Sequence, residues 1–129
     1  MEARETVKYE VVVGVPDDIF YESTNRVLMT THWQRYADEY FEKTGVYVSA
    51  IANDGKALYK VEWGCPVCGE PVITFNCTAN PEFIKDMDLY DAGVLYIAKN
   101  LKKNFKQNTV TITKLPAGIY YLTNDNMEE

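Results

Sequence analysis

The stretch that most constrains the fold is THWQRYADEYFEKTG, residues 31–45. Thr31 and Gln34 match a capping box, in which each side chain satisfies a free backbone N–H of the first helical turn, so a helix should begin here. Gly45 supplies a residue suited to the left-handed stop at its end. The apolar residues between these signals recur at the spacing of one helix face: Trp33, Tyr36, Ala37, Tyr40 and Phe41.

Strand patterns lie on both sides of this helix. Residues 7–13 alternate apolar with polar or smaller side chains, as a half-buried strand does. Residues 46–52 and 57–63 are rich in β-branched and aromatic side chains, and Asn53-Asp54-Gly55-Lys56 between them suits a tight turn. We expect these two runs to form a hairpin that continues into a strand over residues 71–77, which gives a three-stranded meander.

The C-terminal third predicts a second helix and a last pair of strands. Asn80-Pro81 opens a short turn, and Asp88 is suited to cap the longer helix that follows. Residues 109–114 and 119–122 read as strands around a turn that contains Pro116, and residues 26–29 as a further short strand. The buried stripe of the second helix is Val94, Ile97, Ala98, Leu101 and Phe105.

Together these elements predict an α+β fold. The sheet is expected to be mainly antiparallel, built from the meander and the terminal strands, with two helices packed on one face. With 129 residues, of which 47% are hydrophobic and 25% charged, the chain is long and apolar enough for one core. We expect a single domain over residues 1–123 and a frayed acidic tail over residues 124–129.

Charge and hydropathy limit the partners. The N-terminus lacks the apolar run of a secretory signal and no segment is apolar enough to span a membrane, so we expect a cytoplasmic protein without membrane contact. A net charge of -6 argues against binding to nucleic-acid phosphates. A weak basic ridge on the second helix is better explained by solvation and the helix dipole: Lys99, Lys102, Lys103 and Lys106.

The most distinctive motif is Gly64-Cys65-Pro66-Val67-Cys68-Gly69. It resembles one half of a zinc ribbon or rubredoxin-type site, in which backbone N–H groups point at two thiolates, and the resemblance implies zinc as a cofactor. A structural zinc ion takes four ligands. The ligands beyond Cys65 and Cys68 would have to come from His32, from the knuckle of a second chain in a homodimer, or from a partner protein. Cys77 lies too far along the following strand and is expected to be a buried, inert thiol.

Signals for catalysis are weak. A thiol oxidoreductase with a C-x-x-C motif needs a helix directly after it to lower the thiol pKa, whereas Cys68 runs into Glu70-Pro71 and a strand. His32 is the only histidine, and its expected place in a first helical turn does not favour acid–base work. Neither a Gly-rich phosphate loop nor a nucleophile elbow is present in the sequence.

The sequence therefore favours a small non-enzymatic binding module acting through protein–protein contacts. Its composition is similar to that of phage or mobile-element accessory and inhibitor proteins, some of which present acidic surfaces. A zinc-knuckle protein that joins two chains or docks a partner is the alternative, and a thiol oxidoreductase is the third. The predicted binding surface consists of Asp17, Asp18, Glu22, Asp38, Glu39 and Glu42, with the aromatic residues Trp63, Tyr90 and Tyr121.

Overall fold

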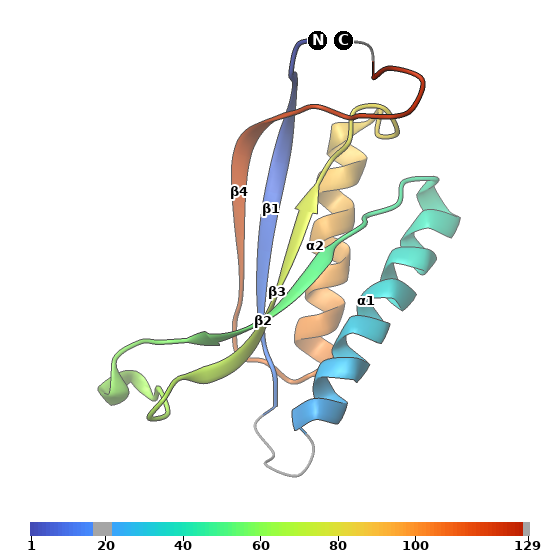
Figure 1. The fold of residues 1–129 in the computed structure, drawn as a ribbon. Coiled ribbons are helices and arrows are strands. Elements are labelled where there is room, and N and C mark those ends of the chain that lie inside the picture. The colour runs from blue at the N-terminus through green and yellow to red at the C-terminus, as the bar shows by residue number, and fades with distance from the viewer. Residues whose placement is uncertain (17–21, 128–129) are drawn as a thin grey trace.

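The structure is a computed structural model that describes residues 1–16 and 22–127. Four strands and two long helices make up the fold, with one short 3₁₀ turn between the second and third strands (Figure 1). In chain order the elements are β1 (Arg4–Gly14), α1 (Glu22–Thr44), β2 (Ile51–Ala57), the 3₁₀ turn η1 (Val61–Trp63), β3 (Glu70–Thr78), α2 (Met87–Asn104) and β4 (Val110–Ile119).

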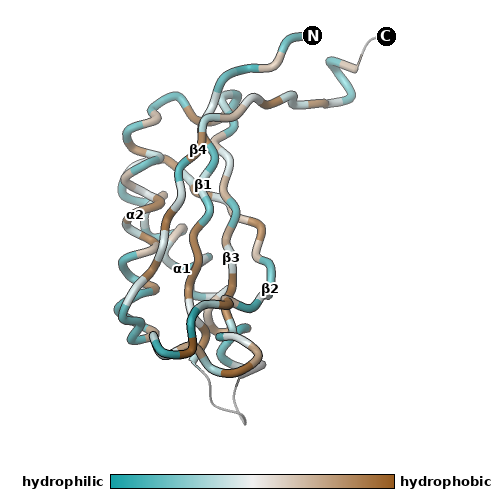
Figure 2. Tube along the Cα trace, turned by 90° about the vertical axis from the view of Figure 1, so that its left-hand side faces the viewer, coloured by the Kyte–Doolittle hydropathy of each residue, from teal (hydrophilic) through white to brown (hydrophobic). Residues whose placement is uncertain are grey.

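The strands form one antiparallel sheet in the order β2-β3-β1-β4. Both helices cover the same face of this sheet and pack against each other, as the two views agree (Figures 1 and 2). Neither α1 nor α2 covers the other face. The predicted α+β class, with an antiparallel sheet and two helices on one face, is confirmed. No helix within the described ranges is both long and apolar enough to cross a bilayer.

The core lies between the sheet and the helices. Alternate residues of β1 and β3 point into it, and the Trp33 ring of α1 stacks on Phe75 of β3 with ring centroids 4.5 Å apart. The Trp33 indole N–H also donates to the Val48 carbonyl at 3.2 Å, which ties the segment before β2 to the helix. Burial of these rings on one side of the sheet fixes its register, because a slip of one residue would turn them outward.

Helix α1 begins earlier than its sequence predicted. Its first residue is Glu22, so the strand expected at 26–29 and the capping box at Thr31 are wrong. Inside the helix the Thr31 hydroxyl donates back to the Val27 carbonyl at 2.9 Å. Met29 is fully buried one turn before Trp33 and so extends the apolar stripe. The C-terminal prediction is confirmed, because Gly45 has φ +77° and its N–H donates to the Phe41 carbonyl.

The predicted hairpin around Asp54-Gly55 is wrong. Instead of turning there, the chain continues as strand β2, and Asp54 and Gly55 pair with Ile73 and Val72 of β3. The Arg26 guanidinium of α1 holds this edge strand in place, since it donates to the Asp54 carboxylate at 3.0 Å and to the Val72 carbonyl at 2.9 Å. A tertiary contact has therefore overridden a local turn preference, and the three-stranded meander becomes one long hairpin of β2 and β3.

Two further boundaries differ from the sequence expectation. Strand β4 runs unbroken through Pro116, which pairs with Val7, where a turn between two strands was predicted. Proline is tolerated there because β4 is an edge strand and loses no ladder hydrogen bond on its open side. Helix α2 is capped by Asp86 rather than Asp88, since the Asp86 carboxylate accepts from the Leu89 N–H at 3.0 Å. The predicted buried stripe of α2 is confirmed.

One carboxylate links α2 to two strands. Asp91 accepts from the Lys114 ammonium of β4 at 2.9 Å and from the Tyr9 hydroxyl of β1 at 2.8 Å. These hydrogen bonds, that from Lys114 first, lower the pKa of Asp91 below its ordinary value, and burial opposes them. Stability from this contact is therefore present above about pH 4 and is lost as the pH falls through the lowered pKa.

We expect Asp91→Asn to lower the free energy of unfolding at pH 7 by about 0.5–1 kcal/mol, because the pair is partly exposed and screened by solvent. The difference from the wild type should shrink at pH 3 and below, where the native carboxyl also becomes protonated. Urea unfolding at the two pH values measures it. An equal loss at both values would show that the charge on Asp91 contributes nothing.

Candidate functional site

A long excursion separates β2 from β3. It spans residues 58–69, which we call the extension, and it projects from one end of the sheet (Figure 1). Residues 58–69 are all described, and among them Cys65 carries the only buried side chain, 6% exposed. Its thiol accepts from the Tyr59 N–H at 3.4 Å and donates to the Ala57 carbonyl at 3.7 Å. The cysteine of the predicted knuckle thus anchors the extension to the end of β2.

The knuckle has the expected turn geometry. Gly64 and Gly69 both have positive φ, and the Gly69 N–H donates to the Pro66 carbonyl at 3.0 Å. Cys68 is exposed and also has positive φ. Glu70 and strand β3 follow directly, so no helix stands after the cysteines to activate them.

The structure does not bring the predicted metal ligands together. No cluster of three or more His, Cys, Asp or Glu side chains suited to a metal exists within residues 1–16 and 22–127. His32 lies on α1, where its ring packs edge-on against Phe105 and its Nδ1 is 2.6 Å from the Leu28 carbonyl oxygen. A zinc ion completed by a second chain stays a prediction of the sequence.

Thiol reactivity will report on the knuckle. In the native protein we expect one thiol per chain to react rapidly with an aromatic disulfide reagent, because Cys68 is exposed whereas Cys65 and Cys77 are buried. Burial also raises the pKa of Cys77 to about 12, as expected of an inert core thiol. Removal of the fast phase by Cys68→Ser would confirm the assignment. Two fast thiols would mean that the extension opens in solution.

Next to the knuckle, Tyr59 at the start of the extension meets Glu70, the first residue of β3. The Tyr59 hydroxyl donates to Glu70 Oε2 at 2.9 Å. This hydrogen bond, with smaller contributions from burial and from the negative charge of Glu70, raises the pKa of Tyr59. The phenol therefore stays protonated and fixes one oxygen of the carboxylate. The junction of β2 and β3 that Cys65 stabilises thus presents an oriented carboxylate.

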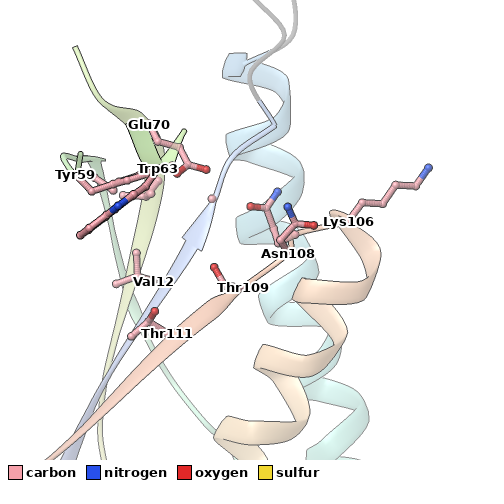
Figure 3. Close-up of a pocket in the computed structure, with 12 residues that line it drawn as sticks. Val12, Tyr59, Trp63, Glu70, Lys106, Asn108, Thr109 and Thr111 are labelled. Atoms are coloured by element: carbon pink, nitrogen blue, oxygen red, sulfur yellow. Dashed lines mark hydrogen bonds between the residues drawn. The ribbon is translucent and has the colours of Figure 1, made fainter. Parts of the chain in front are cut away.

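This pair lines a cavity of about 570 Å³ on the face of the sheet away from the helices. Val12 lies in the wall, whereas its neighbours Val11 and Val13 are buried beneath the helices, so the cavity is on the opposite side of β1. Figure 3 shows Tyr59, Trp63 and Glu70 on one side of it. The remaining lining residues are Gly14, Ala57, Val72, Lys106, Gln107, Asn108, Thr109 and Thr111.

The two walls differ in chemistry. The extension contributes two aromatic rings, and the first residue of β3, Glu70, contributes the only carboxylate among the described lining residues. Asn108 and Thr109, from the connection between α2 and β4, contribute amide and hydroxyl groups across β1. The Lys106 side chain points away from the cavity in Figure 3. An aromatic wall, one negative charge and a set of neutral polar groups suit a cationic, partly aromatic small molecule.

A shallower hollow of about 590 Å³ lies at His32, between α1 and the end of α2. No carboxylate lines it within the part of the chain that the structure describes. The His32 ring at its edge packs against Phe105, as a structural side chain does. The volume of this hollow matches that of the Glu70 cavity, but its described lining residues offer no negative charge and no carboxylate held by a neighbouring hydroxyl. The cavity at Glu70 is therefore the better candidate site.

The predicted acidic surface is only partly described. Asp17, Asp18 and the side chain of Glu22 lie outside the described residues. Asp38 and Glu42 are exposed on α1. Glu39 is occupied: it accepts from the Tyr96 hydroxyl at 3.2 Å and lies 3.6 Å from the Arg35 guanidinium. A protein partner for this surface stays a prediction.

The three predicted aromatic contacts fall in different places. Trp63 is 75% exposed and lines the Glu70 cavity. Tyr121 is exposed near the C-terminus, with its ring against Phe83. Tyr90 is 1% exposed in the core, so its predicted role as a surface contact is wrong. The helix period that packs Tyr90 with Val94 and Ile97 was the signal for its burial.

Sequence patterns indicated no role for Tyr59, Glu70 or Gln107. Tyr59 and Glu70 are 11 positions apart and meet only because the extension folds back on itself. Gln107 reaches the same cavity from the connection between α2 and β4. The one available signal was a polar Glu at the start of a strand that is otherwise buried. In the sequence, Glu70 marks only where the next strand begins after the knuckle.

Comparisons with known proteins now bear on this site. The fold is similar to that of a phage SAM lyase in complex with S-methyl-5′-thioadenosine, with 16% identity, a TM-score of 0.52, and coverage of 95% of this chain and 93% of that one. It is also similar to a phage SAM lyase in the apo state, with 16% identity, a TM-score of 0.50, and coverage of 93% and 94%. No curated protein matches the sequence.

The sequence itself matches a family model described as SAM lyase over residues 4–123. This match overturns the prediction of a non-enzymatic binding module, together with its zinc-knuckle and thiol oxidoreductase alternatives. Those predictions failed because they treated the extension as a docking or metal motif, whereas it supplies a wall of a cavity. The Glu70 cavity was missed because its lining residues are far apart in sequence. With nearly its whole length matched, the chain belongs to the SAM lyase family.

Proposed function

We propose that this protein cleaves S-adenosylmethionine and releases methylthioadenosine, and that the cavity at Glu70 is its active site. The observation that carries the proposal is the Tyr59–Glu70 pair beside an indole in a cavity of about 570 Å³. That volume lies within the range of small-molecule sites. The substrate carries a sulfonium and an ammonium group, which the single carboxylate complements.

Each wall has a part in binding. An aromatic ring stacks well on a purine, and Trp63 presents an exposed indole with Lys60 over one ring face at 5.9 Å. The amide and hydroxyl groups opposite suit the ribose and the amino-acid carboxylate. Tyr59 holds the Glu70 carboxylate in one orientation, so that binding need not order it.

The reaction needs no group that the cavity lacks. The bond between the sulfonium sulfur and Cγ breaks, its electron pair goes to sulfur, and neutral methylthioadenosine leaves. The four-carbon remainder regains an electron pair at Cγ in one of two ways: its own carboxylate closes a lactone, or a base takes a β-proton and a double bond forms. Both routes balance without water, as a lyase requires. The main contribution open to the protein is to hold the four-carbon chain of the substrate in a reactive conformation.

The test is incubation of the purified full chain with S-adenosylmethionine, followed by chromatography for methylthioadenosine and NMR of the four-carbon product in D₂O. Methylthioadenosine together with a lactone or an unsaturated acid supports the proposal. Homoserine as the first product would indicate hydrolysis instead. Formation of no methylthioadenosine above the uncatalysed rate would overturn the proposal.

A further inference from the structure

The cysteine knuckle contacts the start of the extension at two points. The Cys65 sulfur accepts a hydrogen bond from the Tyr59 N–H at 3.4 Å. The second contact comes from Gly69: a Cβ atom built on it would lie 2.7 Å from Leu58 Cδ2 and 3.2 Å from the Ala57 carbonyl oxygen. The knuckle therefore holds the backbone of residues 57–59 both by a hydrogen bond and by close packing.

The Cys65 thiol has a partner for each of its hydrogen-bonding roles. The carbonyl oxygens of Pro66 and Ala57 lie 3.3 Å and 3.7 Å from the sulfur, so the S–H has an acceptor. The sulfur lone pairs are left to accept from the Tyr59 N–H. Because Cys65 is buried, bulk water does not compete for these contacts. A side chain at position 65 must therefore both donate and accept, which a hydroxyl group can do and a methyl group cannot.

Tyr59 connects this contact to the Glu70 cavity. Its N–H is bound at the Cys65 sulfur, whereas its hydroxyl donates to Glu70 Oε2 at 2.9 Å. Tyr59 is 41% exposed, so packing alone holds the ring only weakly. A shift of the backbone at Tyr59 would move the phenol relative to the carboxylate that it orients.

We infer that Cys65 is a positioning residue for the reaction in the Glu70 cavity, because its thiol holds the Tyr59 backbone where the phenol meets Glu70. The inference rests on the proposed function, since it concerns the Tyr59–Glu70 pair of that same cavity. Cys65 does not line the cavity and acts only through Tyr59. In this role the thiol serves as a hydrogen-bond partner rather than as a nucleophile or a metal ligand.

Substitutions at the two knuckle cysteines separate these roles. Cys65→Ala should lower kcat/KM for S-adenosylmethionine by about tenfold, because Tyr59 is loosened rather than removed. Cys65→Ser restores a donor and an acceptor and should stay within about threefold of the wild type. Cys68→Ala is the matched control: Cys68 belongs to the same knuckle but is exposed, so this variant should behave as the wild type. Release of methylthioadenosine measures all three.

A double-mutant cycle tests whether Cys65 acts through Tyr59. In a Tyr59→Phe background, Cys65→Ala should cost less than about twofold, because the hydroxyl that the thiol positions is already absent. Thermal unfolding shows that each variant is folded at the assay temperature. If Cys65→Ala does not fold, Cys65→Val takes its place, since valine fills the space without a hydrogen-bonding group. Losses that simply multiply would show a general structural role and overturn the inference.

Amide hydrogen exchange of Tyr59 gives a measurement that needs no substrate. Its N–H should exchange about tenfold or more faster in Cys65→Ala than in the wild type, whereas Cys65→Ser should retain the protection. Two-dimensional NMR of ¹⁵N-labelled protein measures both rates. Unchanged exchange in Cys65→Ala would overturn the inference, because the thiol would then not hold this backbone group.

The remaining outcomes distinguish the inference from the proposed function. If Cys65→Ser or Cys68→Ala loses as much activity as Cys65→Ala, the two thiols act as a pair, and the positioning role is overturned while the proposed function stands. A wild type that releases no methylthioadenosine shows instead that the proposed function has failed, and the role in the reaction fails with it. The exchange rates then still report whether Cys65 holds Tyr59.

Discussion

Replacement of Glu70 by Gln should lower kcat/KM for S-adenosylmethionine by about 100-fold, which corresponds to about 3 kcal/mol. The substitution keeps the size of the side chain but removes the only carboxylate among the described lining residues of the cavity. It also places an amide opposite the Tyr59 hydroxyl and the Gln107 oxygen, where an NH₂ group competes with the substrate cation. Steady-state release of methylthioadenosine measures the effect.

Glu62→Gln is the matched control for this experiment. Glu62 lies in the extension near Glu70 and is exposed, but it does not line the cavity. The Glu62→Gln substitution removes one negative charge from the same region, as Glu70→Gln does. A general electrostatic effect on a cationic substrate would therefore act through both positions. Equal losses in the two variants would contradict a direct role for Glu70, as would a Glu70→Gln enzyme with wild-type kcat/KM.

Phe75→Ala should be the most destabilising single substitution, with a loss of about 3–5 kcal/mol in the free energy of unfolding. Phe75 is 1% exposed at the centre of β3, and its ring stacks on Trp33 of α1. Removal of the ring leaves a cavity between sheet and helix that rigid backbone elements on both sides cannot close. Tm should fall by roughly 10–20 °C, as calorimetry or circular dichroism would show.

Phe83→Ala is the control for that prediction. Phe83 is 65% exposed and makes only a ring contact with Tyr121, so its removal should change stability by less than about 1 kcal/mol. A Phe75→Ala loss no larger than that of Phe83→Ala would show that the sheet and α1 are not packed as described. Because β3 also carries Glu70, partial unfolding of Phe75→Ala should reduce activity in proportion to the unfolded fraction.

The fold class was predictable because its signals are local and periodic. The 3.6-residue stripes of both helices and the alternation in β1 and β3 depend only on which face of an element is buried. Errors arose where a local preference met a tertiary contact. Arg26 holds Asp54 in an edge strand despite its Asp-Gly turn signal, and Pro116 is accepted on the open side of β4.

The site was much harder to predict than the fold. Cys65 was conspicuous in the sequence, and its pattern indicated a metal ligand, yet in the structure the thiol fixes the Tyr59 backbone. Tyr59 and Glu70 themselves match no motif. Their roles follow from a hydrogen bond that forms only when the extension doubles back.

By itself the sequence determined the α+β class, the buried stripe of α2, the Gly45 stop and the buried state of Cys77, because burial on one face imposes a period on the chain, whereas Phe41 of the stripe predicted for α1 is exposed. Only the tertiary structure decided that Tyr59, Glu70, Gln107 and Gly14 share one cavity. They come from β1, the β2–β3 connection, the start of β3 and the α2–β4 connection. Residues that meet only across a sheet leave no periodic pattern in the sequence. Chemistry at this site therefore depends on distances that exist only after folding.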